Sequence, residues 1–199
     1  MFSGIIQSTG IVQSIEDKGS TKLMTVSSSI SNALHIDQSI AHNGVCLTIV
    51  KVHDGNHQVE IVNETLSKTN LGSLQPGQIV NLEKSITMET LLDGHLIQGH
   101  VDNTLRCEKI EDLDGSWLMQ FNLPKDFEAL IIPHGSICIN GVSLTVANLF
   151  DHSFDVAIIP YTYEHTNFKF IKEDDMVNVE FDLIGKYLLR QLETRTLTE

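Results

Sequence analysis

The feature that most constrains this chain is a seven-residue sequence that occurs twice. Residues 43–49 read NGVCLTI, and 97 residues later residues 140–146 read NGVSLTV. An Asn-Gly dipeptide followed by an apolar, β-branched run is typical of a tight turn that opens a strand. The similarity continues without a gap over residues 41–83 and 138–180. A repeat at this long period predicts a duplicated domain.

Each half contains a series of short strand-like runs separated by turns. In the first half these runs cover residues 2–15, 21–28, 39–42, 45–52, 57–62 and 79–84. Six short strands with no long amphipathic helix between them favour a small closed barrel over alternating strands and helices. Only short helical segments are expected, at residues 29–34, 63–70 and 88–92. We therefore predict an all-β chain with one barrel in residues 1–88 and a second in residues 89–182.

Residues 183–199 have no counterpart after the first half. Apolar residues at positions 184, 188, 189 and 192 form a helical stripe. A lone apolar helix appended to two barrels needs a surface to bury against, and a second subunit is one candidate. We therefore expect residues 183–199 to form a C-terminal α-helix that acts in oligomerisation.

The charge balance and the cysteine content exclude several functional classes. The 199 residues carry a formal net charge of −13, so the basic surface that nucleic-acid binding requires is absent and an anionic membrane would repel the chain. No apolar run approaches the length of a membrane span, and residues 1–6 lack the pattern of a signal peptide. The three cysteines, Cys46, Cys107 and Cys138, form no CxxC pair, which favours reduced thiols in the cytoplasm.

The repeated strand carries the first candidate chemical groups. Side chains two residues apart share a face of a strand, so Cys46 and Thr48 point the same way, as do Ser143 and Thr145. A polar pocket in each half is one interpretation of these pairs. The alternative is that Cys46 is a small buried hydrophobic residue and that the threonines reflect β-propensity alone.

A second distinctive stretch, residues 94–102, reads GHLIQGHVD. Its structural interpretation is a bulged strand equivalent to residues 2–7, and its two histidines also raise the question of a metal site. His95 and His100 project to opposite faces of a regular strand, and no cysteine or acidic cluster completes a ligand set, so no metal is expected. Asp182, which follows the last strand, is either a solvated strand end or an acidic group of a site.

Four motifs in order carry a family resemblance. They are MFSGII at residues 1–6, the pair NGVCLT and NGVSLT, GHLIQGHVD, and VNVEFDLIGKYLLR at residues 177–190. Together they resemble riboflavin synthases of the trimeric, duplicated-barrel type over nearly the whole chain. The resemblance implies two six-stranded Greek-key barrels and a C-terminal helix that forms a homotrimer. It also implies that two molecules of 6,7-dimethyl-8-ribityllumazine exchange a four-carbon unit, giving riboflavin and 5-amino-6-ribitylamino-pyrimidinedione, with no cofactor or metal.

The same resemblance implies a set of site residues. The working site would lie between the N-terminal barrel of one subunit and the C-terminal barrel of its neighbour. The expected catalytic residues are Cys46, His100, Ser143 and Asp182, with Ser39, Thr48 and Thr145 as polar support. The expected substrate-binding residues are Gly4, Ile5, Ile6, Ser39, Cys46, Leu47, Thr48, Glu60, Ile61, Val62, Asn63, Glu64, Thr65, Gly99, His100, Val101, His134, Ser143, Leu144, Thr145, Ala157, Ile158, Ile159, Pro160, Tyr161 and Thr162.

Two positions depart from the family pattern, and some alternatives stay open. His134 stands where a Lys is common, which predicts a weaker or pH-dependent cationic contact, and Asn140 stands where an Asp is frequent, where we expect a turn role. The alternative function is a non-catalytic lumazine- or flavin-binding protein, although such relatives depart from the histidine motif and the Cys46 thiol that this chain keeps. The identity of the attacking nucleophile and an association with lumazine synthase are left open.

Overall fold

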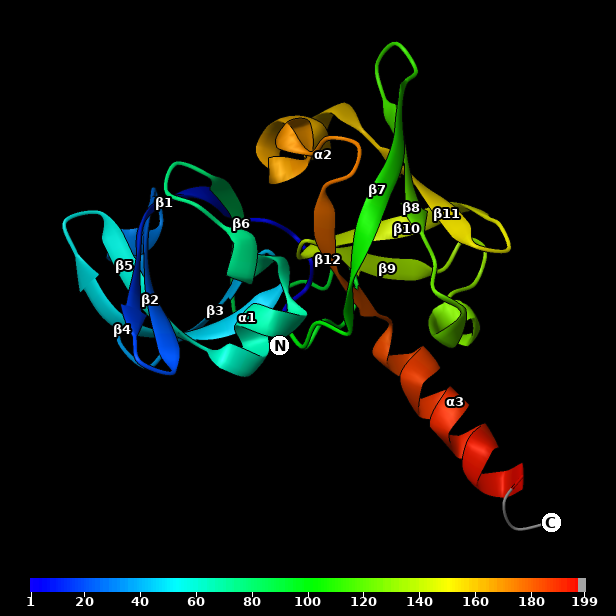
Figure 1. Ribbon diagram of the computed structural model, residues 1–199, viewed down its shortest axis with the longest axis horizontal. Helices are drawn as coiled ribbons and strands as arrows, with labels where there is room; N and C mark the ends of the chain where they lie inside the picture. The colour runs from blue at the N-terminus through cyan, green and yellow to red at the C-terminus, as the bar shows by residue number, and fades with distance from the viewer. Residues whose placement is uncertain (197–199) are drawn as a thin grey trace.

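The computed structural model describes residues 1–196 and consists of two barrels from which one helix projects (Figure 1). The strands of the N-terminal barrel are β1 (Ser8–Lys18), β2 (Thr21–Ser28), β3 (Ser39–His42), β4 (Val45–His53), β5 (Asn56–Val62) and β6 (Ile79–Lys84). Those of the C-terminal barrel are β7 (Asn103–Asp112), β8 (Trp117–Asn122), β9 (Ser136–Ile139), β10 (Val142–Leu149), β11 (Ser153–Ile158) and β12 (Met176–Phe181). The helices are α1 (Asn63–Lys68), α2 (Pro160–His165) and α3 (Leu183–Thr196), with 3-10 turns η1 (Ser31–Ala33), η2 (Asn70–Ser73), η3 (Lys125–Leu130) and η4 (Asn167–Phe170).

The two barrels share one strand order. The N-terminal barrel closes as β1-β2-β5-β4-β3-β6, and the C-terminal barrel repeats this order as β7-β8-β11-β10-β9-β12. Neighbouring strands pair antiparallel. Their order is that of a Greek key and not that of a simple meander, in which each strand pairs with the next along the chain. The predicted all-β fold of two six-stranded barrels followed by a helix is therefore confirmed.

Alternation along the strands fills each barrel with apolar side chains. In β4, Val45, Leu47 and Ile49 are buried in the barrel core, whereas Cys46 and Thr48 lie on the outer wall. Full burial of one such aliphatic side chain stabilises a fold by roughly 1.5–3 kcal/mol, and a one-residue slip in register would turn this set outward. The polar groups of the repeated motif are therefore presented on the outside of a filled barrel.

The two Asn-Gly turns meet at the junction between the barrels. Asn43 and Gly44 have φ angles of 46° and 79°, and Asn140 and Gly141 have φ angles of 46° and 83°, as a type I′ hairpin turn requires. A Cβ added to Gly44 would lie 2.8 Å from the Gly141 nitrogen, and one added to Gly141 would lie 2.7 Å from the Gly44 nitrogen. Glycine is needed here because the two turns touch backbone to backbone, at a pseudo-twofold axis that relates the halves.

Asparagine side chains join the barrels around this axis. They form three repeat-related pairs, Asn43 with Asn140, Asn70 with Asn167, and Asn81 with Asn178. The Asn81 amide donates to Asn140 O at 2.9 Å, and the Asn178 amide donates to Asn43 O at 2.8 Å, which is the same contact in the opposite direction. Asn140, which we expected to have a turn role, also accepts from the Asn178 N–H at 2.8 Å. The repeated asparagines therefore fix the relative orientation of the barrels.

Three local expectations were wrong. The first strand begins at Ser8 rather than at residue 2, and residues 94–102 form no strand beyond one bridge between Phe2 and Ile97. Residues 88–92 form no helical turn, because Thr87 and Thr90 close a simple turn through a hydrogen bond of 3.2 Å. Both misread segments, residues 2–7 and 94–102, leave their own barrels and run along the junction, so their apolar pattern reflects contacts that alternation within one strand cannot describe.

Helix α3 follows β12 and points away from both barrels (Figure 1). The helix expected over residues 183–199 is present from residue 183 to residue 196. Residues 197–199 lie outside the described part of the chain. In residues 1–196 no helix is both long enough and apolar enough to cross a membrane.

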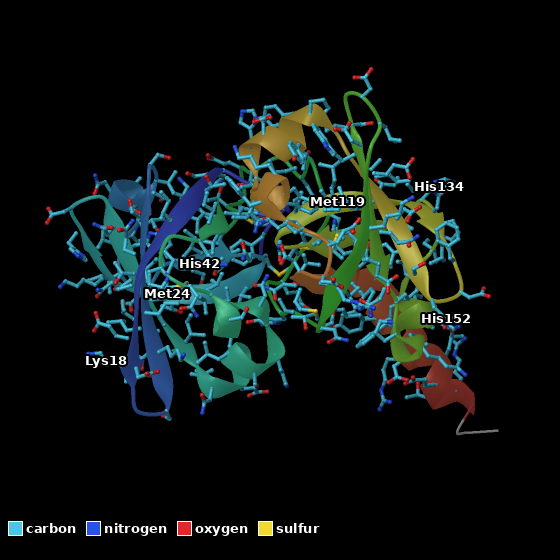
Figure 2. All side chains as sticks on the ribbon, turned by 45° about the horizontal axis from the view of Figure 1, so that its top comes forward. Lys18, Met24, His42, Met119, His134 and His152 are labelled. Carbon is cyan, nitrogen blue, oxygen red and sulfur yellow. The ribbon has the colours of Figure 1, made fainter. Side chains whose placement is uncertain are left out.

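A pair of buried histidines distinguishes the N-terminal barrel from its repeat. His42, inside the N-terminal barrel (Figure 2), shares an Nε2–Nε2 hydrogen bond of 2.9 Å with His57, whose Nδ1 is 2.8 Å from Ser31 Oγ. Burial lowers the pKa of His57 to about 4, and burial together with the neighbouring His57 holds the pKa of His42 well below its ordinary value. The corresponding positions of the C-terminal barrel are Ile139 and Phe154. The pair is therefore ionisable in the N-terminal barrel and apolar in its repeat.

We predict that the N-terminal barrel loses stability when the pH falls from 6.5 to about 4. The folded state keeps both rings neutral while the unfolded chain takes up protons below its ordinary pKa, so His57 alone removes about 2 kcal/mol between pH 7 and pH 5. Urea unfolding at pH 7 and at pH 5 measures this change in the free energy of unfolding. The double variant H42I/H57F, which copies the C-terminal barrel, should lose this part of the pH dependence, and an unchanged dependence would contradict the prediction.

Candidate functional site

Two segments cross the junction between the barrels and bring the candidate residues together. We call residues 2–6 the N-terminal crossing segment and residues 95–101 the second crossing segment. They run antiparallel, joined by a hydrogen bond of 2.7 Å from the Phe2 N–H to Ile97 O, and the chain begins between the barrels (Figure 1). Phe2 and Ile97 are both buried and pack with Ala41 and Cys138, one from each barrel.

Each crossing segment borders the barrel of the other half. Ser143 N–H donates to Gly4 O, and Cys46 N–H donates to Gly99 O, both at 2.9 Å. Beyond these bonds, Ile6 packs against the core of the C-terminal barrel and Val101 packs against the core of the N-terminal barrel. The contacts are reciprocal: Ser143 is the repeat-related partner of Cys46, so Gly4 of one crossing segment corresponds to Gly99 of the other.

Two buried carboxylates hold the crossing segments in place. Glu83 accepts from the Ser3 N–H and Oγ, both at 2.7 Å, and from the Gly4 N–H at 3.0 Å. Its repeat-related partner Glu180 accepts from three consecutive N–H groups, those of Gln98, Gly99 and His100, at 2.7–2.9 Å. Burial raises the pKa of both carboxyl groups, and these donors oppose that shift. Neither glutamate was among the expected site residues, although a glutamate that recurs at the same position of the last strand in both copies was a usable signal.

The first face consists of Cys46, Thr48 and Ser39 with residues 99–101 of the second crossing segment. Cys46 is half-buried, Thr48 is exposed and lies opposite Ser39 on the neighbouring strand, and His100 is exposed. Of the other expected contacts, Glu60, Val62, Asn63, Glu64 and Thr65 follow one another along the end of β5 and the start of α1. Leu47 and Ile61 are buried in the barrel core, so their side chains face away from this surface.

The second face consists of Ser143 and Thr145 with residues 4–6 of the N-terminal crossing segment. The Ser143 Oγ lies 2.7 Å from Nδ1 of His95. Burial lowers the pKa of His95, and the nearby Asp182 carboxylate opposes this shift. Asp182 also caps helix α3, because its Oδ1 accepts from the Ile184 N–H at 2.9 Å. His95 was missed as a site residue because its sequence motif does not reveal which of two histidines meets a hydroxyl group.

The remaining expected residues of the second face come from β10, β11 and α2. Leu144 is half-buried, Ala157 and Ile159 are exposed at the end of β11, and Ile158 lies in the barrel core. Pro160 opens α2, where Tyr161 is 69% exposed and stacks on His165, while Thr162 is half-buried. His134 is exposed on the C-terminal barrel (Figure 2) and donates its N–H to Val146 O at 3.0 Å.

The two faces are related by the repeat but differ in chemistry. Cys46 on the first face corresponds to Ser143 on the second, and His100 corresponds to Ile5 because Gly99 corresponds to Gly4. The first face therefore offers a thiol and an imidazole, whereas the second offers a hydroxyl group bonded to His95. Within one chain, the four expected catalytic residues thus divide into Cys46 with His100, and Ser143 with Asp182.

Two hollows in the described part of the chain include none of the four expected catalytic residues. A cavity of about 460 Å³ lies between the barrels, lined by asparagines of the junction, by apolar residues in or next to β6, η4 and β12, and by Asp174 and Asp175 of the turn before β12. A wide depression of about 550 Å³ at α1 includes Asn63 and Glu64 but neither Cys46 nor Ser143. Within residues 1–196, no three His, Cys, Asp or Glu side chains gather closely enough to hold a metal ion.

Comparisons with known proteins agree on one family. The model of the lumazine binding domain matches residues 3–85 and 98–182. The riboflavin synthase of Bacillus amyloliquefaciens is 34% identical over 100% of this chain and 93% of its own length, and that of Actinobacillus pleuropneumoniae is 35% identical over 94% and 88%. The riboflavin synthase of Buchnera aphidicola is 37% identical over 95% and 92%.

Solved structures share the fold at lower identity. The crystal structure of LumP complexed with 6,7-dimethyl-8-(1'-D-ribityl) lumazine has a TM-score of 0.82 and 23% identity over 91% of this chain and 99% of that chain. LumP complexed with riboflavin has a TM-score of 0.85 and 24% identity over the same shares. At this identity the similarity establishes the arrangement of two barrels.

We predict that Cys46 is the first cysteine to be alkylated in the native protein. Cys46 is half-buried at the first face, whereas burial raises the pKa of Cys107 to about 12 and that of Cys138 well above its ordinary value. Mass spectrometry after brief treatment with iodoacetamide should find one modified thiol, and the C46S variant should remain unmodified until it is unfolded. Equal labelling of Cys107 or Cys138 in the folded protein would contradict this order.

Proposed function

Because the chain belongs to the riboflavin synthase family, we propose that it converts two molecules of 6,7-dimethyl-8-ribityllumazine into riboflavin and 5-amino-6-ribitylamino-pyrimidinedione. The observation that carries this proposal is the pair of faces that are alike in backbone and unlike in chemistry. A reaction between two copies of one molecule needs two sites of similar shape, because each must bind the same ring system and ribityl chain. It also needs different reactive groups, because one copy gives up four carbons and the other receives them.

The first face has the groups for removing a proton. The methyl group at C7 of the substrate is acidic, since its carbanion is delocalised into the ring, and imidazole is the side chain whose titration is best suited to accept such a proton near neutral pH. His100 is exposed beside Cys46 on this face, and Glu180 holds its backbone N–H. We assign His100 as the general base and Cys46 and Thr48 as neighbouring polar contacts.

The second face has the groups for the complementary step. The other substrate molecule is attacked at an electrophilic ring carbon by a hydroxyl group or by a bound water molecule, and a hydroxyl group is activated when an imidazole takes its proton. Ser143 meets this condition through its 2.7 Å contact with His95. The transfer balances without an external oxidant or reductant, because the four-carbon unit lost by one lumazine is gained by the other. Holding the two rings face to face lowers the barrier by removing translational freedom before the reaction.

Oligomerisation through α3 is part of the proposal, because it would bring unlike faces of different subunits together. On α3, Ile184, Leu188 and Leu192 are 66%, 57% and 63% exposed, so an apolar stripe faces away from the barrels. A stripe of this kind is stabilised when it packs against copies of itself. We propose a homotrimer in which the first face of one subunit meets the second face of the next, in a cytoplasmic enzyme with three unpaired cysteines.

A non-catalytic lumazine- or flavin-binding protein is the second candidate, and the fold shared with LumP favours it. The candidate reactive groups argue for the enzyme, because Cys46, His95 and His100 are all retained and the riboflavin synthases are more similar in sequence, at 34–37% identity. The two candidates differ in turnover and agree in binding.

The expected result with the purified protein is conversion of the ribityllumazine to riboflavin, followed by absorbance. The variant His100→Ala should lower kcat on the order of a hundredfold, because general-base catalysis contributes a factor of roughly 10²–10⁴. His35→Ala, which changes an exposed histidine of the same barrel, serves as the control and should keep the original rate. Tight ligand binding without turnover by the unmodified protein would replace the enzyme with the binding protein.

Replacing the apolar stripe of α3 should dissociate the assembly. The variant I184D/L188D places two carboxylates where we expect subunits to pack, so light scattering should report the monomer mass while the barrels stay folded by circular dichroism. Turnover should fall with the assembly, because in a monomer the first face no longer meets the second face of a neighbouring subunit. A trimer that persists in this variant would refute the role assigned to α3.

A further inference from the structure

Helix α3 is anchored to the C-terminal barrel through its first turn. Besides the cap provided by Asp182, the Lys186 Nζ lies 2.5 Å from Asp102 Oδ2, and the two side chains are only 22% and 23% exposed. The attraction within an ion pair that is largely shielded from solvent is screened less than that of a pair at the open surface. Beyond this turn α3 leaves the barrel (Figure 1). The Lys186–Asp102 pair therefore lies between the barrel and the part of the helix that projects.

Asp102 directly follows the second crossing segment and ties its end to β12. Its N–H donates to Val179 O at 2.9 Å, and its Oδ2 accepts from the Phe181 N–H at 2.9 Å. Between these two contacts on β12 lies Glu180, which holds the N–H groups of residues 98–100. Burial raises the pKa of Glu180, and the charge of Lys186 is among the influences that oppose the shift. One lysine of α3 thus pairs with Asp102, whose contacts on β12 lie on either side of the acid that holds residues 98–100.

The N-terminal half contains a matched comparison without a helix. Gln7 corresponds to Asp102, as Gly4 corresponds to Gly99, and its Oε1 accepts from the Lys84 N–H at 3.1 Å just as Asp102 accepts from the Phe181 N–H. A neutral amide is therefore sufficient for this backbone contact. After β6 the chain continues into the linker of residues 85–94, and after β12 it continues into α3. The negative charge at position 102 accordingly coincides with the presence of Lys186 rather than with the backbone contact.

We propose that Lys186 and Asp102 are positioning residues that couple helix α3 to the second crossing segment, so that the docking of the helix and the placement of Gly99 and His100 at the first face depend on each other. This inference rests on the proposed function for its catalytic consequence, because only then does the placement of His100 affect turnover. Its structural part, the coupling of helix to segment, stands without that function.

The test compares Lys186→Met and Asp102→Asn with Arg190→Met. Asp102→Asn keeps an oxygen for the Phe181 N–H and removes only the charge, as Gln7 does in the other half. Arg190→Met removes a cation from the same helix, one that pairs with Glu193 on the surface, and is the control. Lys186→Arg keeps the ion pair and is the rescue variant.

Two measurements are made on each variant, amide hydrogen exchange and steady-state kinetics. In Lys186→Met and Asp102→Asn we expect exchange at residues 98–100 on the order of tenfold faster, with residues of β8 unchanged, because a coupling lost at one contact opens the structure locally. We expect kcat per assembled trimer to fall on the order of tenfold, with Lys186→Arg and Arg190→Met close to the original protein.

Each outcome decides one part of the inference. If the amide hydrogens of residues 98–100 exchange at the rate of the Arg190→Met control, the coupling is overturned, whether or not the variant assembles. It is also overturned if amide exchange in β8 accelerates equally, because that result signals general destabilisation. Faster exchange with unchanged kcat per trimer would refute the catalytic consequence. If the unmodified protein shows no turnover, the proposed function fails, and the exchange measurements still decide the coupling.

Discussion

The junction between the barrels depends on buried amide groups that satisfy one another. Asn43, Asn81, Asn140 and Asn178 are each at most 2% exposed, and their partners lie across the pseudo-twofold axis. A buried polar group without a partner costs about 1–3 kcal/mol, so rotation or sliding of one barrel against the other would break several such contacts at once. The crossing segments, the carboxylates that hold them and the two faces all take their positions from this rigid arrangement.

Approximate symmetry allows the same backbone to support different chemistry. The contacts that build each face come from main-chain groups and from residues that recur in both halves, such as Glu83 and Glu180. The positions that differ, Cys46 against Ser143 and His100 against Ile5, contribute side chains to the surface without carrying the fold. Substitution at these positions is therefore possible at little structural cost, which is how a duplicated site becomes chemically unequal.

The sequence was sufficient to predict the repeat, the barrels and the C-terminal helix, because the alternation of buried side chains and the Asn-Gly turns are local signals. It was not sufficient to predict the path of residues 2–7 and 94–102, whose partners lie in the opposite half of the chain. The contact between His95 and Ser143 and the role of Glu180 are equally non-local. Local alternation also did not separate the expected residues that line the two faces from Leu47, Ile61 and Ile158, whose side chains are buried in the barrel cores.

The reciprocal contacts at the junction have the geometry of an isologous dimer interface, in which residue i of one copy meets residue j of the other and the reverse. In this protein a peptide linker of residues 85–94 joins the two copies. A contact that would otherwise require two molecules to meet is thereby intramolecular, with an effective concentration in the millimolar range for a short flexible linker. Pairing of the halves is for this reason independent of dilution, and only the higher assembly of whole chains remains sensitive to the amount of protein present.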